Sequence, residues 1–260
     1  MPDLTAADTH FAFGENWRSF ARTVDAEAIA KSDEGIARLF PDGQLNGKRV
    51  LDVGCGSGLP ALSMLGAGAG HVTCVDIDPN SVAAAQATLG RYAPAGLWTA
   101  ATASVFDLTG AFDVVYSWGV LHHTGDMARA IRKAASLVAP GGLLAIAIYE
   151  KTHLCWAWKV EKRLYARAPR FVQGGARWLY HAARRAYGFL VGEKQQPPQD
   201  RGMEVEHDLH DWMGGWPYES ASRTEVETLV GWRLLSHRSP GGGSLGLFGS
   251  GCAEYVFQAP

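Results

Sequence analysis

The residues best suited to bind a small ligand follow a short apolar run. A glycine-rich segment at residues 54–58 separates that run from a second apolar stretch. Glycines are needed in such a turn when a ligand approaches the backbone too closely for a Cβ. A dinucleotide-binding turn would carry a further glycine at position 59, where this chain has Leu59. Asp52 precedes the first glycine by two residues and would repel a pyrophosphate, so the pattern favours a ligand with an ammonium group.

A second carboxylate stands at a matching place downstream. Asp76 ends another apolar run, 22 residues after Gly54, where an acidic side chain can accept hydrogen bonds from both hydroxyls of a ribose. A single Asp at a strand end is also a common turn or cap residue. Taken with Asp52 and the glycines, however, Asp76 predicts S-adenosylmethionine (SAM), which carries an ammonium, a sulfonium and a ribose but no phosphate.

Alternating strands and helices must position these residues. From about residue 48 onwards, short apolar runs alternate with helix-like stretches, which predicts a parallel sheet covered by helices on both faces. The fold class is therefore α/β, a doubly wound, Rossmann-like, mostly parallel seven-stranded sheet. We expect strands at residues 49–53, 71–75, 112–117, 143–149, 232–236 and 253–257 and a weaker one that ends near Val105, with helices at residues 59–65, 79–89, 128–138 and 223–230.

The chain divides into four segments. Residues 1–47 are expected to form an N-terminal helical segment, with a helix start signal at residues 23–25 and a stop signal at residues 41–43. Residues 48–150 form the ligand-binding core. Residues 151–200 are predicted to be a helical insertion that serves as a lid or an interface, and residues 201–260 complete the core sheet. As a lid, the insertion would close over the substrate together with the N-terminal helix.

Five segments in order resemble the motifs of class I SAM-dependent methyltransferases. They are residues 50–58, 75–79, 105–108, 117–123 and 139–142. This resemblance implies that Asp52, Gly54 and Gly56 hold the methionine part of SAM.

The same resemblance implies the remaining cofactor contacts. Asp76 would bind the ribose, and Phe106 with Asp107 would face the adenine. Trp17, Ile77 and Ser117 complete the set of residues expected to contact SAM.

The flanks resemble a bacterial subfamily of these methyltransferases. The matching parts are residues 13–17, Tyr149 and residues 211–219. That subfamily usually carries an Asn before the last strand, where this chain has Ala253, so any role of that Asn is absent here.

Methyl transfer to a hydroxyl usually needs a proton acceptor, worth roughly 10²–10⁴ in rate. His122 and His123 closely follow the fourth strand of the core, whose end faces the reacting methyl group in this fold. The pair could equally be structural, since it is common in the family whatever the substrate. His123 is the preferred catalytic base, and Tyr149 is the other candidate. Tyr149 could also be only part of the pocket wall.

The flanking segments are rich in aromatic side chains. As a group they suggest a flat or apolar substrate, although ordinary packing explains any one of them. The acidic and His-rich residues 204–211 match no zinc template and are expected to form a solvated or hydrogen-bonded loop, so no metal site is predicted. The aromatic residues are Phe13, Trp17, Trp118, Trp156, Trp158, Trp212, Trp216 and Tyr218.

The net charge of −2 hides a strong polarity. Residues 151–194 hold ten Lys and Arg against two acids, a net charge of +8, and the rest of the chain carries −10. Trp156, Val160 and Leu164 share one face of the first helix expected there, and Trp178 and Phe189 share one face of the second. The segment could be a solvated face, a homodimer interface, a site for an anionic substrate, a peripheral membrane contact or an RNA-binding surface.

The expected function is SAM-dependent methyl transfer to a small-molecule acceptor, aromatic or anionic, with an oxygen nucleophile. Nucleic acid is the less favoured partner, because the chain as a whole is near neutral. The alternatives are methylation of tRNA or another macromolecule, and a protein that uses SAM for another reaction or only as a ligand. With no signal-peptide pattern and no apolar run near 20 residues, the expected location is the cytoplasm.

Overall fold

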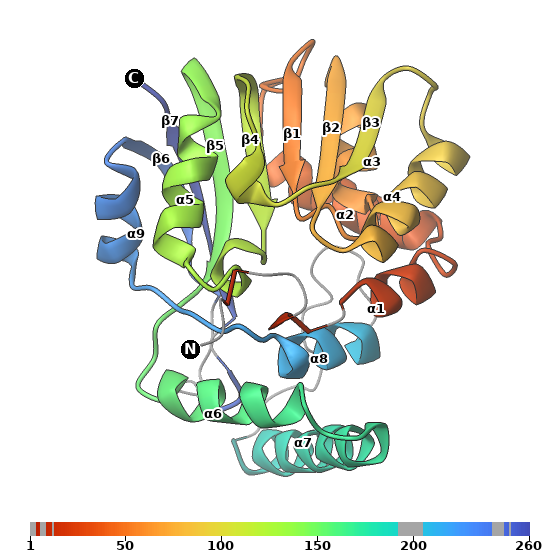
Figure 1. The fold of residues 1–260 in the computed structure, drawn as a ribbon, viewed down its shortest axis with the longest axis vertical. Coiled ribbons are helices and arrows are strands. Elements are labelled where there is room, and N and C mark those ends of the chain that lie inside the picture. The colour runs from red at the N-terminus through yellow and green to blue at the C-terminus, as the bar shows by residue number, and fades with distance from the viewer. Residues whose placement is uncertain (1–3, 6–8, 12, 192–204, 241–246, 250) are drawn as a thin grey trace.

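The chain folds around one seven-stranded sheet (Figure 1). The computed structural model describes residues 4–5, 9–11, 13–191, 205–240, 247–249 and 251–260. The strands lie in the order β3-β2-β1-β4-β5-β7-β6, and only β7 runs opposite to the other six. The mostly parallel sheet expected from the sequence is thereby confirmed. The strands are β1 Arg49–Val53, β2 His71–Asp76, β3 Trp98–Thr102, β4 Phe112–Trp118, β5 Val138–Tyr149, β6 Arg233–Arg238 and β7 Cys252–Gln258.

Helices cover both faces of the sheet. One face packs against α2 (Ala26–Leu39), α3 (Leu59–Gly66) and α4 (Pro79–Tyr92). The other packs against α5 (Met127–Ser136) and α9 (Arg223–Val230). The strand order reverses between β1 and β4, and the carboxyl ends of parallel strands beside such a reversal form the usual ligand crevice.

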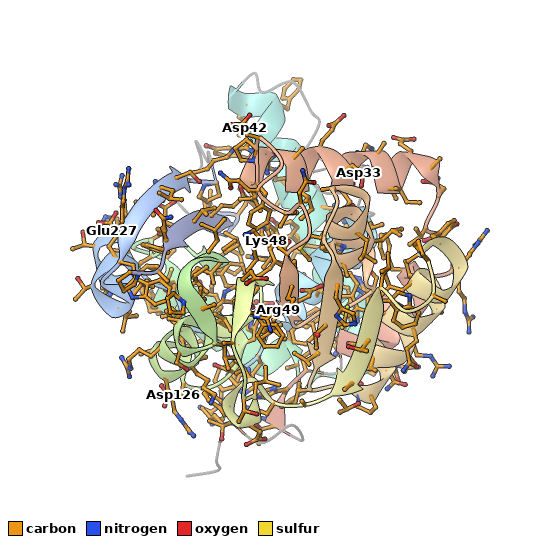
Figure 2. All side chains as sticks on the ribbon, turned by 90° about the horizontal axis from the view of Figure 1, so that it is seen from above. Asp33, Asp42, Lys48, Arg49, Asp126 and Glu227 are labelled. Atoms are coloured by element: carbon orange, nitrogen blue, oxygen red, sulfur yellow. The ribbon has the colours of Figure 1, made fainter. Side chains whose placement is uncertain are left out.

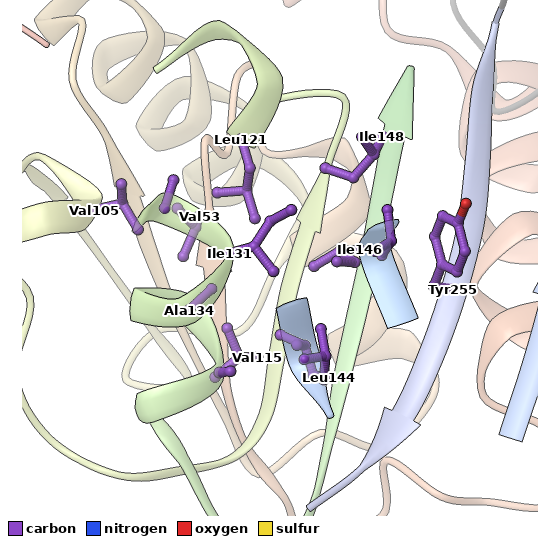
Figure 3. Packing of buried hydrophobic residues seen from close by; sticks show 14 of the residues in the cluster. Val53, Val105, Val115, Leu121, Ile131, Ala134, Leu144, Ile146, Ile148 and Tyr255 are labelled. Carbon is purple, nitrogen blue, oxygen red and sulfur yellow. The ribbon is translucent and has the colours of Figure 1, made fainter. Parts of the chain in front are cut away.

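The core under α5 holds the sheet rigid (Figure 3). Val115 of β4 and Leu144 and Ile146 of β5 meet Ile131 and Ala134 of α5, and all five are at most 2 % exposed. Each buried aliphatic side chain of this size contributes about 1.5–3 kcal/mol, so the strand ends that carry the polar residues are firmly placed.

Two strand boundaries differ from the sequence prediction. β3 ends at Thr102, and Val105–Asp107 form a 3-10 turn instead of the end of a strand. The side chain of Ser104 accepts a hydrogen bond from the Phe106 amide and so begins that turn. Val138, expected in a helix, already belongs to β5, because its pairing with Phe112 is followed by a register shift that absorbs residues 139–142.

The N-terminal segment forms the expected helices. α1 spans Phe13–Phe20, and α2 begins at Asp25, whose carboxylate caps the Ala28 amide. Both the predicted start at residues 23–25 and the stop before residues 41–43 are confirmed.

The insertion lies beyond the carboxyl ends of the strands, at the bottom of Figure 1. It forms α6 (Cys155–Tyr165) and α7 (Arg170–Val191), and α8 (Val205–Gly214) lies between these helices and α1. Most of the segment expected to be a loop, residues 204–211, is therefore helical, and that part of the prediction is wrong. Residue 204 itself lies outside the described residues.

The amino ends of the strands form the opposite edge of the sheet, seen from above in Figure 2. Lys48 and Arg49 lie at the start of β1, and the Asp113 carboxylate accepts a hydrogen bond from the Arg49 amide at 2.8 Å. The Arg49 Nε atom also lies 3.6 Å from the Asp113 carboxylate, so the starts of β1 and β4 are joined at this edge.

Candidate active site

A cavity of about 320 Å³ opens at the carboxyl ends of the central strands. Its floor is the loop after β1, and its walls come from the ends of β2, β4 and β5. The remaining wall is supplied by the N-terminal segment and by α8, through residues such as Phe13, Trp17, Asp211 and Trp212. No described residue of α6 or α7 lines it, so α1 and α8 enclose the cavity and the insertion lies behind α8.

The glycine loop is shaped by close packing as well as by its turn. Gly54 and Gly56 have φ values of +76° and +51°, which favour glycine. A Cβ on Gly54 would lie 2.3 Å from a Val120 methyl carbon, and one on Gly56 would lie 3.0 Å from the Trp17 ring. The absent Cβ atoms therefore make room for Val120 and Trp17, which pack on the loop and line the cavity with it.

Both predicted carboxylates reach the cavity. Asp52 is buried and lines it beside the loop. Asp76 accepts hydrogen bonds from the Gly56 amide at 3.2 Å and the Asp78 amide at 2.9 Å. Burial raises the pKa of Asp76 to about 6, although these two amides act in the opposite direction. A carboxylate offers about four acceptor sites, so Asp76 can still accept ribose hydroxyls.

Of the two residues predicted to face the adenine, one lines the cavity and the other does not. Phe106 lines the cavity, and the Arg129 guanidinium lies over its ring, 4.4 Å from the ring centroid. Ala103 and Ser104 line the same end. Asp107 is exposed and is not part of the lining, so its predicted contact with the adenine would need a change of its side-chain position.

Two of the other three residues predicted to contact the cofactor line the cavity, and the third does not. Trp17 and Ile77 line the cavity. Ser117 is fully buried and does not line it, because its hydroxyl donates to the Val53 carbonyl at 2.9 Å and ties β4 to the end of β1. The position of Ser117 makes it a support for the glycine loop.

The two histidines have different surroundings. His123 lines the cavity, and its Nδ1 lies 2.7 Å from the Pro217 carbonyl, which can only accept. The proton therefore sits on Nδ1, and Nε2 carries the lone pair. Burial lowers the pKa of His123 to about 3, while the backbone carbonyls of Pro217 and Gly215 favour its charged form. His122 does not line the cavity, and its Nδ1 accepts from the Tyr149 amide at 3.4 Å.

Tyr149 lies at the centre of an aromatic cluster. Its ring is 3.9 Å from the His122 ring and 5.4 Å from both His123 and Tyr218, measured between centroids. The Lys162 ammonium of α6 lies 5.8 Å from the same ring. Tyr149 lines the cavity, so it can contact an acceptor and can also serve as its wall.

Several site residues were missed from the sequence. Asp211 is buried in the cavity wall and accepts a hydrogen bond from the Asn16 amide group at 2.8 Å, which joins α8 to α1. Asn16 and Asp211 belong to the two flanking motifs, but only the fold brings them together. Lys162 is fully buried, donates to the Trp212 carbonyl and lies 3.9 Å from the Trp212 ring.

The charge of the cavity is unlike that of the insertion. Its described lining residues include the carboxylates Asp52, Asp76 and Asp211 but no Lys or Arg. Among the residues that the structure describes, no group of His, Cys, Asp and Glu is arranged to hold a metal ion. A cation with an apolar body suits this lining better than an anion does.

SAM fits these residues. Its ammonium group suits the buried Asp52 carboxylate, and its ribose suits Asp76. The backbone of the glycine loop lines the cavity beside Asp52, and Phe106 supplies a flat apolar surface for the adenine.

Comparisons with known proteins agree with this site. The family profile described as a methyltransferase domain matches residues 20–218, more than half of the chain. Ubiquinone biosynthesis O-methyltransferase of Aromatoleum aromaticum is 39 % identical over 100 residues, which are 38 % of this chain and 42 % of that protein. tRNA U34 carboxymethyltransferase of Ectopseudomonas mendocina is 44 % identical over 99 residues, which are 36 % of this chain and 30 % of that protein. The match thus spans less than half the length of either relative.

Solved structures share the fold at low sequence identity. Magnesium protoporphyrin IX methyltransferase from Synechocystis PCC 6803, solved with bound S-adenosylhomocysteine, superposes with a TM-score of 0.55 at 19 % identity, covering 89 % of this chain and 83 % of that one. An N-methyltransferase from Bradyrhizobium japonicum, in complex with the same product, has a TM-score of 0.54 at 15 % identity, covering 92 % and 91 %. Together with the profile match, the fold and the carboxylates beside the glycine loop, these findings show that the chain belongs to the class I SAM-dependent methyltransferase family.

Proposed function

We propose that this protein transfers the methyl group of SAM to an oxygen of a small acceptor with a flat or apolar body. The observation that carries this proposal is the lining of the cavity. Its walls include the rings of Phe13, Trp17, Trp118, Tyr149 and Trp212 and no described Lys or Arg.

The chain's own residues would supply binding and orientation. Asp52 and the backbone of the glycine loop would hold the methionine part, Asp76 the ribose, and Phe106 and Ile77 the adenine. When bound, SAM supplies an activated methyl group. Fixing two reactants in line is worth about 7–11 kcal/mol of the barrier, which leaves little covalent chemistry for the protein.

We propose His123 as the group that accepts the proton of the acceptor hydroxyl. Its Nδ1–H is held by the Pro217 carbonyl, so Nε2 is the basic atom. A pKa of about 3 makes this ring a weak base, so proton transfer would occur late, once the new bond to carbon has made the hydroxyl strongly acidic. The Pro217 and Gly215 carbonyls would then stabilise the imidazolium.

The test begins with calorimetry of the purified protein with SAM and with its demethylated product. Absence of binding by both would overturn the proposal. Incubation of hydroxylated aromatic acceptors with SAM labelled in the methyl group should then yield a labelled acceptor and the demethylated product in equal amounts. Release of a different adenosine product would indicate another use of SAM.

The competing candidate is methylation of tRNA or another macromolecule. The tRNA-modifying relative and the basic charge of the insertion favour this candidate. It predicts RNA binding that falls steeply with salt concentration, since phosphate contacts release counterions. RNA that is labelled by the protein while small acceptors are not would favour this candidate.

A further inference from the structure

Two helices of the insertion expose large apolar side chains. On α6, Trp156, Val160 and Leu164 lie four residues apart and point to solvent. On α7, Trp178 and Phe189 also point to solvent, with 72 % and 86 % of their surface exposed. Soluble domains seldom leave so many large apolar side chains open on adjacent elements, so this surface is expected to have a partner.

The same faces carry basic side chains. On α6, Lys159 and Arg163 lie among the apolar residues and are exposed, and Arg167 is exposed just after this helix. On α7, Arg185 is exposed. The acid of this stretch, Glu161, is turned inward and only half-exposed, and the described side chains of residues 151–191 include no exposed acid. The partner surface must therefore combine negative charge with an apolar interior.

We propose that α6 and α7 dock this protein on the surface of an anionic lipid bilayer. An amphipathic helix with Trp, Phe and Leu on one face and Lys or Arg beside them lies in the plane of a membrane interface. The apolar side chains enter the acyl boundary while the bases contact lipid phosphates. The α7 helix lies parallel to this surface, because its exposed apolar side chains extend along its length from Phe171 to Phe189. Among the described helices, none is long and apolar enough to cross a bilayer.

Charge disfavours a second copy of the chain as the partner. A symmetric contact through these faces would place Lys159, Arg163, Arg167 and Arg185 against the same residues of the other copy, and like charges repel. RNA would match the basic side chains, but its phosphates offer no apolar environment for Val160 or Leu164. Both remain measurable outcomes of the test.

The position of the insertion gives this docking a consequence for the site. α6 and α7 are the outermost elements at the cavity end of the molecule (Figure 1). Lys162 joins α6 to the Trp212 carbonyl, and Trp212 lines the cavity. Docking therefore holds the cavity wall close to the bilayer. The docking itself does not depend on which acceptor is methylated.

The test is sedimentation of the purified full-length chain with vesicles. One set contains phosphatidylcholine alone, and the other contains phosphatidylcholine and phosphatidylglycerol. We expect strong binding to the mixed vesicles that falls as salt rises, and weak binding to the neutral ones. No binding to either set, or equal binding to both, would overturn the proposal.

Matched double variants separate the contribution of the apolar side chains to vesicle binding from that of the basic side chains. Trp178→Ser with Phe189→Ser should weaken vesicle binding by at least about tenfold, and the same change at Leu97 and Leu235, exposed elsewhere, should leave it unaltered.

Charge variants complete the set. Lys159→Gln with Arg185→Gln should weaken binding to the mixed vesicles about 25-fold, because the loss of each basic side chain weakens it about fivefold. Arg22→Gln with Arg132→Gln, which removes the same charge from other surfaces, is the control. Equal effects of the test and control pairs would refute the assignment of the surface.

Two further readouts distinguish the other partners. A protein that is dimeric without lipid, and that the Trp178 and Phe189 changes make monomeric, would identify this face as a dimer contact and overturn the proposal. Salt-sensitive RNA binding that Lys159→Gln and Arg185→Gln abolish, without vesicle binding, would do the same.

Discussion

The protonation state of Asp76 should control the affinity for SAM. Burial raises the pKa of this carboxyl to about 6 in the free protein. Only the carboxylate can accept hydrogen bonds from both ribose hydroxyls, so binding requires the ionised form. At pH 5 about one molecule in eleven carries that form, whereas at pH 7 about nine in ten do. We therefore expect the Kd for SAM to rise about tenfold from pH 7 to pH 5.

Calorimetry at these two pH values measures the effect, and Asp76→Asn isolates its source. The variant should bind SAM about 5- to 150-fold more weakly at pH 7, which corresponds to about 1–3 kcal/mol for hydroxyls that lose their acceptor. Its affinity should no longer change between pH 5 and pH 7. Asp33→Asn, on the exposed side of α2, is the matched control and should behave as the unchanged chain does.

Unfolding does not explain the expected loss at pH 5. The pKa of Asp76 is higher in the folded chain than its ordinary value of 3.8. The folded state therefore takes up this proton more readily than the unfolded state, and Asp76 adds stability as the pH falls through about 6. A Kd that stays constant from pH 7 to pH 5, or an Asp76→Asn variant that keeps the pH dependence, would refute the reasoning.

Three other substitutions test separate parts of the site. Gly54→Ala places a Cβ 2.3 Å from Val120 at a φ of +76° and should weaken SAM binding at least tenfold by calorimetry, whereas Gly90→Ala, with open space around it, should not. His123→Ala should reduce kcat about 10²–10⁴-fold with little change in SAM affinity, and equal losses in both would indicate a structural histidine. Burial lowers the pKa of Lys162 to about 7, so the unfolding free energy should rise with pH above 7, where only the unfolded chain binds this proton. Lys162→Met should flatten that rise in denaturant titrations, and an unchanged slope would contradict it.

The core of the fold was predictable because its signals are local. Each strand of the parallel sheet is a short apolar run, and the glycine turn and Asp76 follow such runs directly. Two boundaries were wrong for a physical reason. The 3-10 turn at Val105–Asp107 depends on a hydrogen bond to Ser104, and the early start of β5 depends on pairing with Phe112. Apolar periodicity carries no information on either contact.

The cavity lining was only partly predictable. Trp17, Asp52, Asp76, His123 and Tyr149 reach the cavity as expected from their places at strand ends or in motifs. Their functional roles stay predictions until the variants are measured.

Other placements could be read only from the structure. Ser117 turns to the Val53 carbonyl, although its neighbours in the same motif line the cavity. The N-terminal helix and the insertion were both expected to close over the substrate. Helix α1 does line the cavity, but α8 takes the place expected for α6 and α7.

The sequence by itself determined the family, the cofactor and the strand ends that carry the polar residues, since motif spacing and strand alternation act over a few residues at a time. Tertiary structure decided which surfaces became interior. It joined Asn16 to Asp211 across 195 positions and buried Lys162 against Trp212, while it left the apolar faces of α6 and α7 in solvent. An amphipathic pattern states that a helix has an apolar face, but what that face meets depends on packing between segments far apart in the chain.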